Sequence, residues 1–229
     1  MNNEFNKYAK QHLGIHDNVI KGYQDMRAEL PMVPNASVTP TIIEERKMNV
    51  AAMSVFDRLM MDRILWVAGP VDDRMAIIVQ AQLLFLSDQD PKKAITMHID
   101  SPGGSVKAGL SMVDSMELCE SPIQTINTGM AASMGSVLLG AGTKGMRSSL
   151  RHSRTMLHQS SGGFRGNIQD AEIDMVEWKK LNHQLFDLLG DYCGKPAEVV
   201  MKDASRDMWL SADEALKYGI IDKVVKKKK

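Results

Sequence analysis

Several residue types and patterns are scarce in this 229-residue chain, and each scarcity excludes a class of protein. Its only cysteines, Cys119 and Cys193, are too few for a disulfide-stapled secreted fold. No cluster of histidine, cysteine and carboxylate has zinc-site spacing, so we expect neither a metal nor another cofactor in the chain itself. Charge of one sign is not in excess, because 28 Lys and Arg balance 28 Asp and Glu. We therefore expect no nucleic-acid partner.

A long apolar run is missing as well. Residues Ser121 to Thr143 are uncharged, but the first half of this segment is polar and glycines break the second half. The N-terminal stretch carries charges throughout and lacks the apolar centre of a signal peptide. These features predict a cytoplasmic protein with no membrane contact.

What the chain does contain is enough apolar sequence, 44%, to bury a core. Residues 1–40 read as a polar arm or propeptide, 41–225 as one domain, and 226–229 as a solvated lysine tail. Within the domain, strands near residues 63–69, 93–100, 122–129 and 154–160 alternate with helices near 72–89, 106–118, 133–141 and 168–192. This alternation predicts a layered α/β fold.

Two helices carry clear end signals. The longest, 168–192, has one apolar stripe and should stop at Gly194. Its stripe residues are Ile168, Ala171, Met175, Trp178, Leu181, Leu185 and Leu188. A capping box, "SADE" from Ser211 to Glu214, opens a later helix that Gly219 should end.

Ser133 is the first candidate for chemistry. It lies in "NTGMAASMGSVLLG", where an expected strand turns into a short helix among small residues. The first N–H groups of a helix lack backbone partners and can stabilise a developing oxyanion. Close packing between strand and helix explains a small residue here equally well. The preceding strand ends in "SPGG" (residues 101–104), whose glycines allow N–H groups to turn outward, although an ordinary turn has the same composition.

An activated serine needs a base and an orienting acid. Of six histidines, His158 alone closes an expected strand just before a glycine turn. Near the capped helix, Asp203, Asp207 and Asp213 all remain candidates for the acid, and no spacing separates them. The residues by themselves therefore permit a Ser–His–Asp set without establishing it.

Several motifs, in order from about Thr41 to Val225, resemble the proteolytic subunit of the Clp protease. They are "FDRLMMDRIL", "SPGGSVKAGLSMVDSM", "GMAASMGSVLL", "AGTKGMR", "MLHQ" and "RDMWLSADEALKYGIID". The resemblance implies a ClpP/crotonase-like stack of ββα units with a protruding handle helix, here about residues 168–192. It implies Ser133 as nucleophile, His158 as base and Asp207 as acid, with the backbone N–H groups of Gly104 and Met134 as oxyanion hole.

The same resemblance implies an assembly. Seven subunits would form a ring, and two rings would stack through their handles into a tetradecamer around a proteolytic chamber. Unfolded proteins and peptides would be cleaved there, fed by a hexameric AAA+ unfoldase that alone uses ATP. Arg206, before the acid, would also link the rings. The arm before Thr41 would correspond to a removable propeptide.

Departures from the family pattern concern the site and the partner. Asp100 stands where the family usually has Asn, which would add a carboxylate near the oxyanion loop. The family usually has Pro after "HQ", whereas here Ser160 and Ser161 follow, so we expect a looser strand there. Thr96, His98 and Ser148 replace the aromatic residues of the unfoldase-docking pocket, which predicts a weakened or different partner.

Three other functions compete with a protease. Acyl-CoA chemistry on the same broad fold would need paired N–H groups but no Ser–His–Asp set. A ring-forming scaffold or inactive subunit would fit the altered docking pocket. A Ser–Lys peptidase of the membrane would need an anchor, which the sequence lacks. The triad-compatible residues favour the serine endopeptidase.

Overall fold

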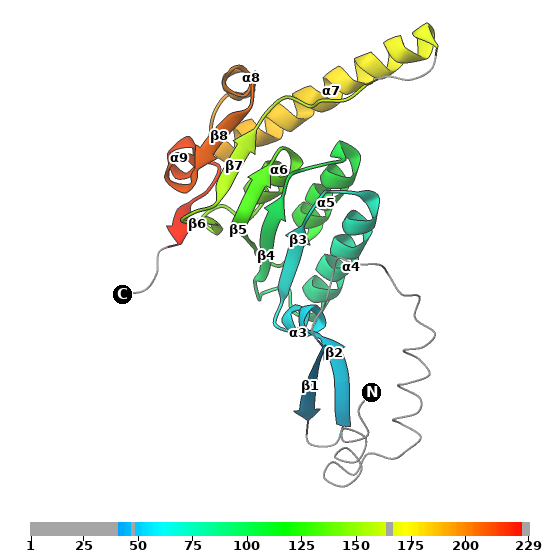
Figure 1. Ribbon diagram of the computed structural model, residues 1–229, viewed down its shortest axis with the longest axis vertical. Helices are drawn as coiled ribbons and strands as arrows, with labels where there is room; N and C mark the ends of the chain where they lie inside the picture. Colours follow the sequence, from blue (N-terminus) through cyan, green and yellow to red (C-terminus); the bar gives the residue numbers. More distant parts are fainter. Residues whose placement is uncertain (1–40, 47–48, 164–166, 226–229) are drawn as a thin grey trace, which may run out of the picture. The chain divides into compact units, whose positions relative to one another are not determined.

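The computed structural model describes residues 41–46, 49–163 and 167–225 of the chain (Figure 1). The main sheet of this part has seven strands. Five strands run in the order β3 (Ile64–Ala68), β4 (Ile95–Ser101), β5 (Ile123–Ala132), β6 (Arg147–Leu150) and β9 (Lys223–Val225). All four of these pairings are parallel. The expected α/β class is thereby confirmed.

The far half of β5 has a second neighbour. Beyond the residues that pair with β6, β5 pairs in parallel with β7 (Arg154–Leu157), and β7 pairs antiparallel with β8 (Met208–Ser211). A separate antiparallel hairpin, β1 (Thr41–Arg46) and β2 (Asn49–Ser54), precedes helix α3 (Val55–Met61). The arm at 1–40 and the tail at 226–229 lie outside the described residues, so their prediction stays a prediction.

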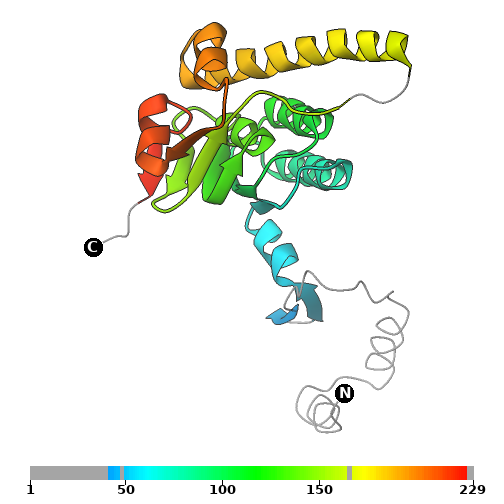
Figure 2. The ribbon, with the colours of Figure 1, turned by 45° about the horizontal axis from the view of Figure 1, so that its top comes forward.

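Helices α4 (Asp73–Gln89) and α5 (Val106–Leu118) lie side by side on one face of the sheet (Figure 2). Their buried faces and the short helix α6 (Met134–Gly140) form the core with the inward residues of the strands. Fully buried members include Leu83, Leu86, Met112, Leu138, Leu65, Ile95, Met97 and Ile99. Strand residues alternate between the two faces. The opposite face of β3–β5 therefore presents Trp66, Thr96, His98 and Ile126, which are only half-buried or exposed.

The long helix α7 (Ile168–Cys193) begins at Asn167, whose side chain accepts from Asp170 N, and ends at Gly194 with φ 66°. Both the helix and its glycine stop are as predicted. The apolar stripe is only partly core, however, because Leu185 is its one buried member among the seven predicted. Ile168 is 79% exposed, since no other described element packs over the first turns of α7.

The last third of the domain contains short elements that the sequence pattern did not predict. They are α8 (Ala197–Asp203), β8 and β9, and β6 belongs with them. Arg147 on β6 holds β9 in place, because its guanidinium pairs with Asp222 at 2.6 Å and also donates to Gly219 O. The predicted helix α9 (Ala212–Tyr218) has both bonds of the Ser211–Glu214 capping box and ends at Gly219.

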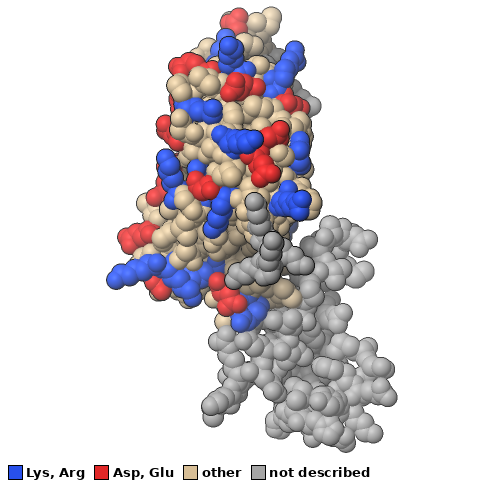
Figure 3. Space-filling view, turned by 90° about the vertical axis from the view of Figure 1, so that its left-hand side faces the viewer, with Lys and Arg blue, Asp and Glu red and all other residues tan. Residues whose placement is uncertain are grey.

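Charges of both signs are interspersed on the face that Figure 3 shows. Among the described residues, no helix is long and apolar enough to cross a membrane. In the same part of the chain, no three His, Cys, Asp or Glu side chains gather in a metal-binding arrangement.

Candidate active site

Ser133 lies at the junction of β5 and α6 in a backbone conformation that is rare for a residue with a side chain, φ 54° and ψ −124°. Hydrogen bonds on both sides of the residue hold this conformation. Its N–H donates to Met156 O on β7 at 2.9 Å, and its carbonyl accepts from Ser136 N at 2.9 Å and Ser136 Oγ at 2.6 Å. Strain of about 1–3 kcal/mol persists only where surroundings over-determine it, and it concentrates at functional sites.

The loop after β4 packs directly against this junction. A Cβ added to Gly103 would lie 2.6 Å from Ser133 Cβ and 2.9 Å from Met134 N, so only glycine fits there. Gly103 O accepts from Val71 N, and Ser105 N donates to Val71 O. Gly104 lies between these two bonds, and its own N–H is therefore turned away from Val71.

Two backbone donors are consequently left without an acceptor among the described residues, the N–H groups of Gly104 and of Met134. Met134 is the first residue of α6, where a helical N–H has no partner within the helix. Both belong to the segments that meet beside Ser133. They are the two groups that the resemblance assigns to an oxyanion hole.

His158 and Asp207 meet because of strand register. β7 and β8 are antiparallel, and Leu157 pairs with Met208, so the next residue of β7 faces the residue before β8. His158 Nδ1 lies 3.3 Å from Asp207 Oδ1. The contact is loose, because the two atoms do not form a hydrogen bond and the Asp207 side chain is 63% exposed.

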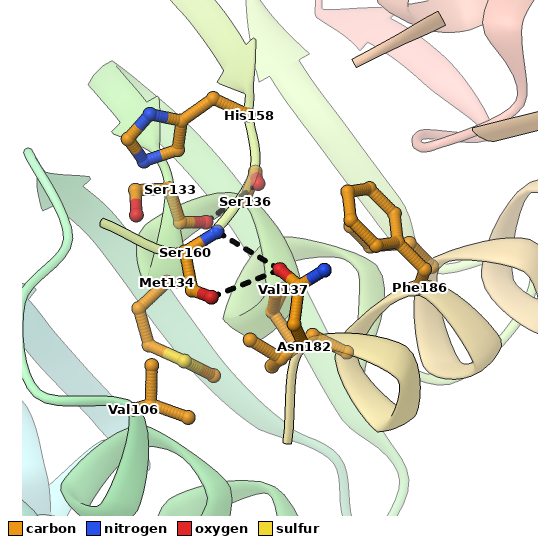
Figure 4. Close-up of a pocket in the computed structure, with 11 residues that line it drawn as sticks. Val106, Ser133, Met134, Ser136, Val137, His158, Ser160, Asn182 and Phe186 are labelled. Carbon is orange, nitrogen blue, oxygen red and sulfur yellow. Dashed lines mark hydrogen bonds between the residues drawn. The ribbon is translucent and has the colours of Figure 1, made fainter. Parts of the chain in front are cut away.

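Figure 4 shows the His158 ring above Ser133 at the mouth of a pocket. Among the hydrogen bonds of the described residues, none joins Ser133 Oγ to this ring. Catalytic hydrogen bonds are often long in the absence of substrate and tighten when it binds. The structure thus brings all three predicted triad residues to one site, although Asp207 stays largely exposed.

The competing acids and histidines have other positions. Tyr218 Oη donates to Asp203 at 3.0 Å, and Asp213 lies in the first turn of α9. His98 stacks on Trp66 with ring centroids 4.7 Å apart, and burial lowers its pKa. His152 and His183 are exposed, whereas His12 and His16 lie outside the described residues.

Two departures from the family pattern look different in the structure. Asp100 accepts from Met130 N on β5 at 2.9 Å, so its carboxylate is engaged by the sheet. The prediction of a looser strand at Ser160 stays a prediction, since residues 158–163 form no strand, although hydrogen bonds connect Ser160 to α7. Ser160 N and Oγ both donate to Asn182 Oδ1, at 3.0 and 2.9 Å, and Trp178 Nε1 donates to Ser160 Oγ at 2.7 Å.

The sequence pattern did not predict that residues of α7 belong to the site. Asn182 lines the same pocket as Ser133 and His158, and Leu185 and Phe186 from the next turn also line it. The available signal was a polar residue one turn before the buried end of α7. This polar residue points to the site only once the structure shows that Asn182 contacts Ser160, which is far away in sequence.

A strained serine at a strand–helix turn, with histidine and carboxylate on neighbouring strands, is the arrangement of a serine hydrolase. Comparison with known sequences agrees. The profile of the family described as Clp protease matches residues 46–228. A protein of Porphyromonas gingivalis called "ATP-dependent Clp protease proteolytic subunit" is 47% identical, covering 98% of each chain. Relatives with the same name from Bacteroides fragilis (46%, covering 98% of this chain and 99% of the relative) and Deinococcus radiodurans (46%, 82% and 93%) agree.

The chain belongs to the Clp protease family. Within that family it is a proteolytic subunit, a serine-type endopeptidase.

Proposed function

We propose that Ser133 is the nucleophile of this endopeptidase, His158 its general base and acid, and Asp207 the group that orients the imidazole. The carrying observation is the strained Ser133, held beside two unpaired N–H donors in the pocket that His158 also lines. Such preorganised donors lower the barrier of acyl transfer by about 2.7–4 kcal/mol each.

The proposed reaction follows from these positions. Ser133 Oγ attacks the carbonyl carbon of the peptide bond while His158 takes the hydroxyl proton. The N–H groups of Gly104 and Met134 bind the oxyanion. When the C–N bond breaks, the imidazolium gives its proton to the leaving amine, and an acyl group remains on Ser133. A water molecule, activated by His158, then releases the acid and restores the serine.

A fluorophosphonate probe followed by intact-mass spectrometry tests the nucleophile. We expect one adduct on the wild-type protein and none on Ser133→Ala. An unlabelled wild-type protein would contradict the proposal and favour the inactive, ring-forming subunit in its place.

We further propose that substrates are unfolded proteins and peptides bound in extended form. β7 is paired on both sides, but the segment after His158 belongs to no strand and includes Gly162 and Gly163. Its free backbone groups are available to a substrate main chain, a mode of binding that tolerates many side chains. Degradation of a casein-like unfolded protein, but not of a folded control, is the expected result.

Self-assembly is part of the proposal, as two stacked heptameric rings with α7 between them. Support comes from the apolar residues at the start of α7, where Ile168, Ile173 and Val176 are 79%, 68% and 55% exposed. Apolar surface of this kind commonly marks an interface. Light scattering coupled to size exclusion should give the mass of fourteen subunits, and a monomer at micromolar concentration would contradict the rings.

We also propose that an ATP-driven hexameric AAA+ unfoldase delivers substrate, as the ATP-dependent name of the relatives suggests, and that the chain itself holds no cofactor. The face of the sheet with the half-buried Thr96 and His98 is its proposed docking surface. Ser148, the third replaced position, is fully buried and donates to a backbone carbonyl of β5, so it adds no contact surface. Trp66, which is 38% exposed, partly replaces the aromatic residues that this surface lacks. It stacks on His98 and contacts Phe56 edge-on.

Docking should therefore depend on a displaced aromatic cluster, with a partner that differs from the usual one. Trp66→Ala should abolish stimulation by the cognate unfoldase while cleavage of short peptides persists. Full stimulation by an unfoldase of a distant family member would contradict the altered partner. A cytoplasmic location completes the proposal, and fractionation of cells checks it.

A further inference from the structure

The pocket beside Ser133 is largely apolar but contains one side chain with unused hydrogen-bond donors. Its apolar lining consists of Val106, Met134, Val137, Leu185, Phe186 and Leu189. Ser133, Ser136, His158, Ser160 and Asn182 complete it. None of these eleven lining residues is a lysine, an arginine or a carboxylate.

The orientation of the Asn182 amide follows from its partners. Ser160 N can only donate, so the Asn182 atom that lies 3.0 Å away must be the oxygen. Ser160 Oγ also donates to this oxygen at 2.9 Å, while Trp178 Nε1 donates to Ser160 Oγ. The hydroxyl hydrogen of Ser160 is thus used, and two hydrogen bonds hold the amide oxygen of Asn182.

The Asn182 nitrogen consequently faces the other way. Figure 4 shows it on the Phe186 side of the amide, away from Ser160. Its two hydrogens have no acceptor among the described residues. Ser136, the other hydroxyl deep in the pocket, donates its own hydrogen to Ser133 O. A half-buried amide donor among apolar side chains is stabilised by any ligand that brings an acceptor.

We propose that Asn182 determines specificity and selects an uncharged substrate side chain that ends in an oxygen acceptor, glutamine or asparagine, immediately before the cleaved bond. This inference rests on the proposed role of Ser133 as nucleophile. A site with an unpaired donor disfavours an apolar isostere, because the donor then stays unsatisfied. A carboxylate is disfavoured as well, because the lining offers no cation to pair with a desolvated charge.

Peptides that differ only at this residue test the proposal on the purified full-length protein. Glutamine, methionine and glutamate are compared, since methionine has nearly the length of glutamine without its oxygen. For the wild-type protein we expect kcat/KM for glutamine to exceed that for methionine by about tenfold. Glutamate should be cleaved more slowly than glutamine.

Two variants separate the donor from the contact with Ser160. Asn182→Asp keeps an oxygen for Ser160 and removes the N–H groups, whereas Asn182→Leu removes both. In each, the glutamine-to-methionine ratio should fall to about one or below, because no donor remains. His183→Ala changes the adjacent exposed residue and should leave the ratio unchanged.

The possible outcomes are distinct. A wild-type preference for methionine, or an unchanged ratio in Asn182→Asp, overturns the inference, and neither result requires Asn182→Leu to fold. Fluorophosphonate labelling of Ser133 reports the proposed function independently of the substrate side chain. Labelling with an unchanged ratio overturns the specificity alone, whereas an unlabelled wild-type protein overturns the proposed function and the inference together.

Discussion

The two sides of the Ser133 pocket differ in how firmly a single chain holds them. On one side, Ser133 sits between β5 and α6, its N–H and carbonyl both hydrogen-bonded, with the Gly103 backbone packed against it. On the other side, His158 follows β7 and Asp207 precedes β8, 3.3 Å apart without an aligned hydrogen bond. Ser133 is half-buried beside core residues, whereas the Asp207 side chain is 63% exposed.

The two sides therefore differ in whether the folding of one chain is enough to fix their geometry. The strained serine and the N–H donors belong to the packed sheet and α6, so their geometry is set when the domain folds. The acid end depends on a four-residue pair of strands at the margin of that core. If the proposed rings form, contacts from a neighbouring subunit at that margin would complete it and couple activity to assembly. Substitutions on the two sides should therefore differ in effect.

The largest effect should come from Ser133→Ala. Removal of a triad serine lowers kcat by about 10⁶-fold in other serine proteases, and we expect a similar loss here. The melting temperature should stay close to that of the wild type, because alanine retains the backbone hydrogen bonds of the junction. Peptide cleavage and thermal melting measure the two quantities. Ser161→Ala, in an exposed position, serves as the control, and activity remaining in Ser133→Ala would break the assignment.

Gly103→Ala should be next in effect. Its Cβ would overlap Ser133 Cβ and Ala132 O, so Ser133 and the Met134 N–H must both shift. We expect at least about a 10²-fold loss of kcat/KM, comparable to loss of an oxyanion donor. The free energy of unfolding should fall by about 2–4 kcal/mol through overpacking and a positive φ of 93°.

Gly145→Ala is the matched control for that substitution. Gly145 has nearly the same φ, 89°, but an added Cβ would meet nothing within 4 Å. Backbone strain alone should then cost about 1–2 kcal/mol, with activity retained. Equal losses in the two variants, measured by urea unfolding, would show that conformation rather than contact with Ser133 decides the effect.

Asp207→Asn tests the loosely held side. Loss of the carboxylate costs about 10⁴-fold where the aspartate is buried and bonded to the histidine. Because Asp207 is largely exposed, we expect a smaller loss of kcat/KM, about 10²-fold. A full 10⁴-fold loss in the assembled protein would mean that assembly holds Asp207 against His158 as firmly as the fold holds Ser133.

How much of the fold could be predicted depends on element length. The helices α4, α5 and α7 span several turns, and their periodicity was sufficient to place them, with Gly194 also marking the end of α7. Strands β6, β8 and β9 have only three or four residues, too few for a period to appear. Their positions depend on distant partners such as the Arg147–Asp222 pair. An amphipathic stripe does not reveal which neighbour covers it, so the exposure of the start of α7 is seen only in the structure.

The site divides in the same way. The position of Ser133 followed from its own segment, because a strand, small residues and a helix occur in sequence. Asp207 could not be separated from Asp203 and Asp213 by residues alone, since the β7–β8 register that brings it to His158 is a tertiary feature. Asn182 was missed for the same reason, because its partner Ser160 lies 22 residues away.

The smallest effect should come from Ser160→Ala, which removes the hydrogen bonds of the Ser160 hydroxyl to Asn182 and Trp178 on α7. Ser160 N still donates to Asn182, so the segment keeps one of its contacts. We expect a loss of about 1 kcal/mol in the free energy of unfolding and about a threefold loss in kcat/KM. Ser161→Ala is again the control, because that neighbour has no hydrogen bond of its own in the described structure. If Ser160→Ala instead lowered kcat/KM by about as much as Asp207→Asn, the position of His158 would depend on the contact with α7. His158 would then be held as firmly as Ser133.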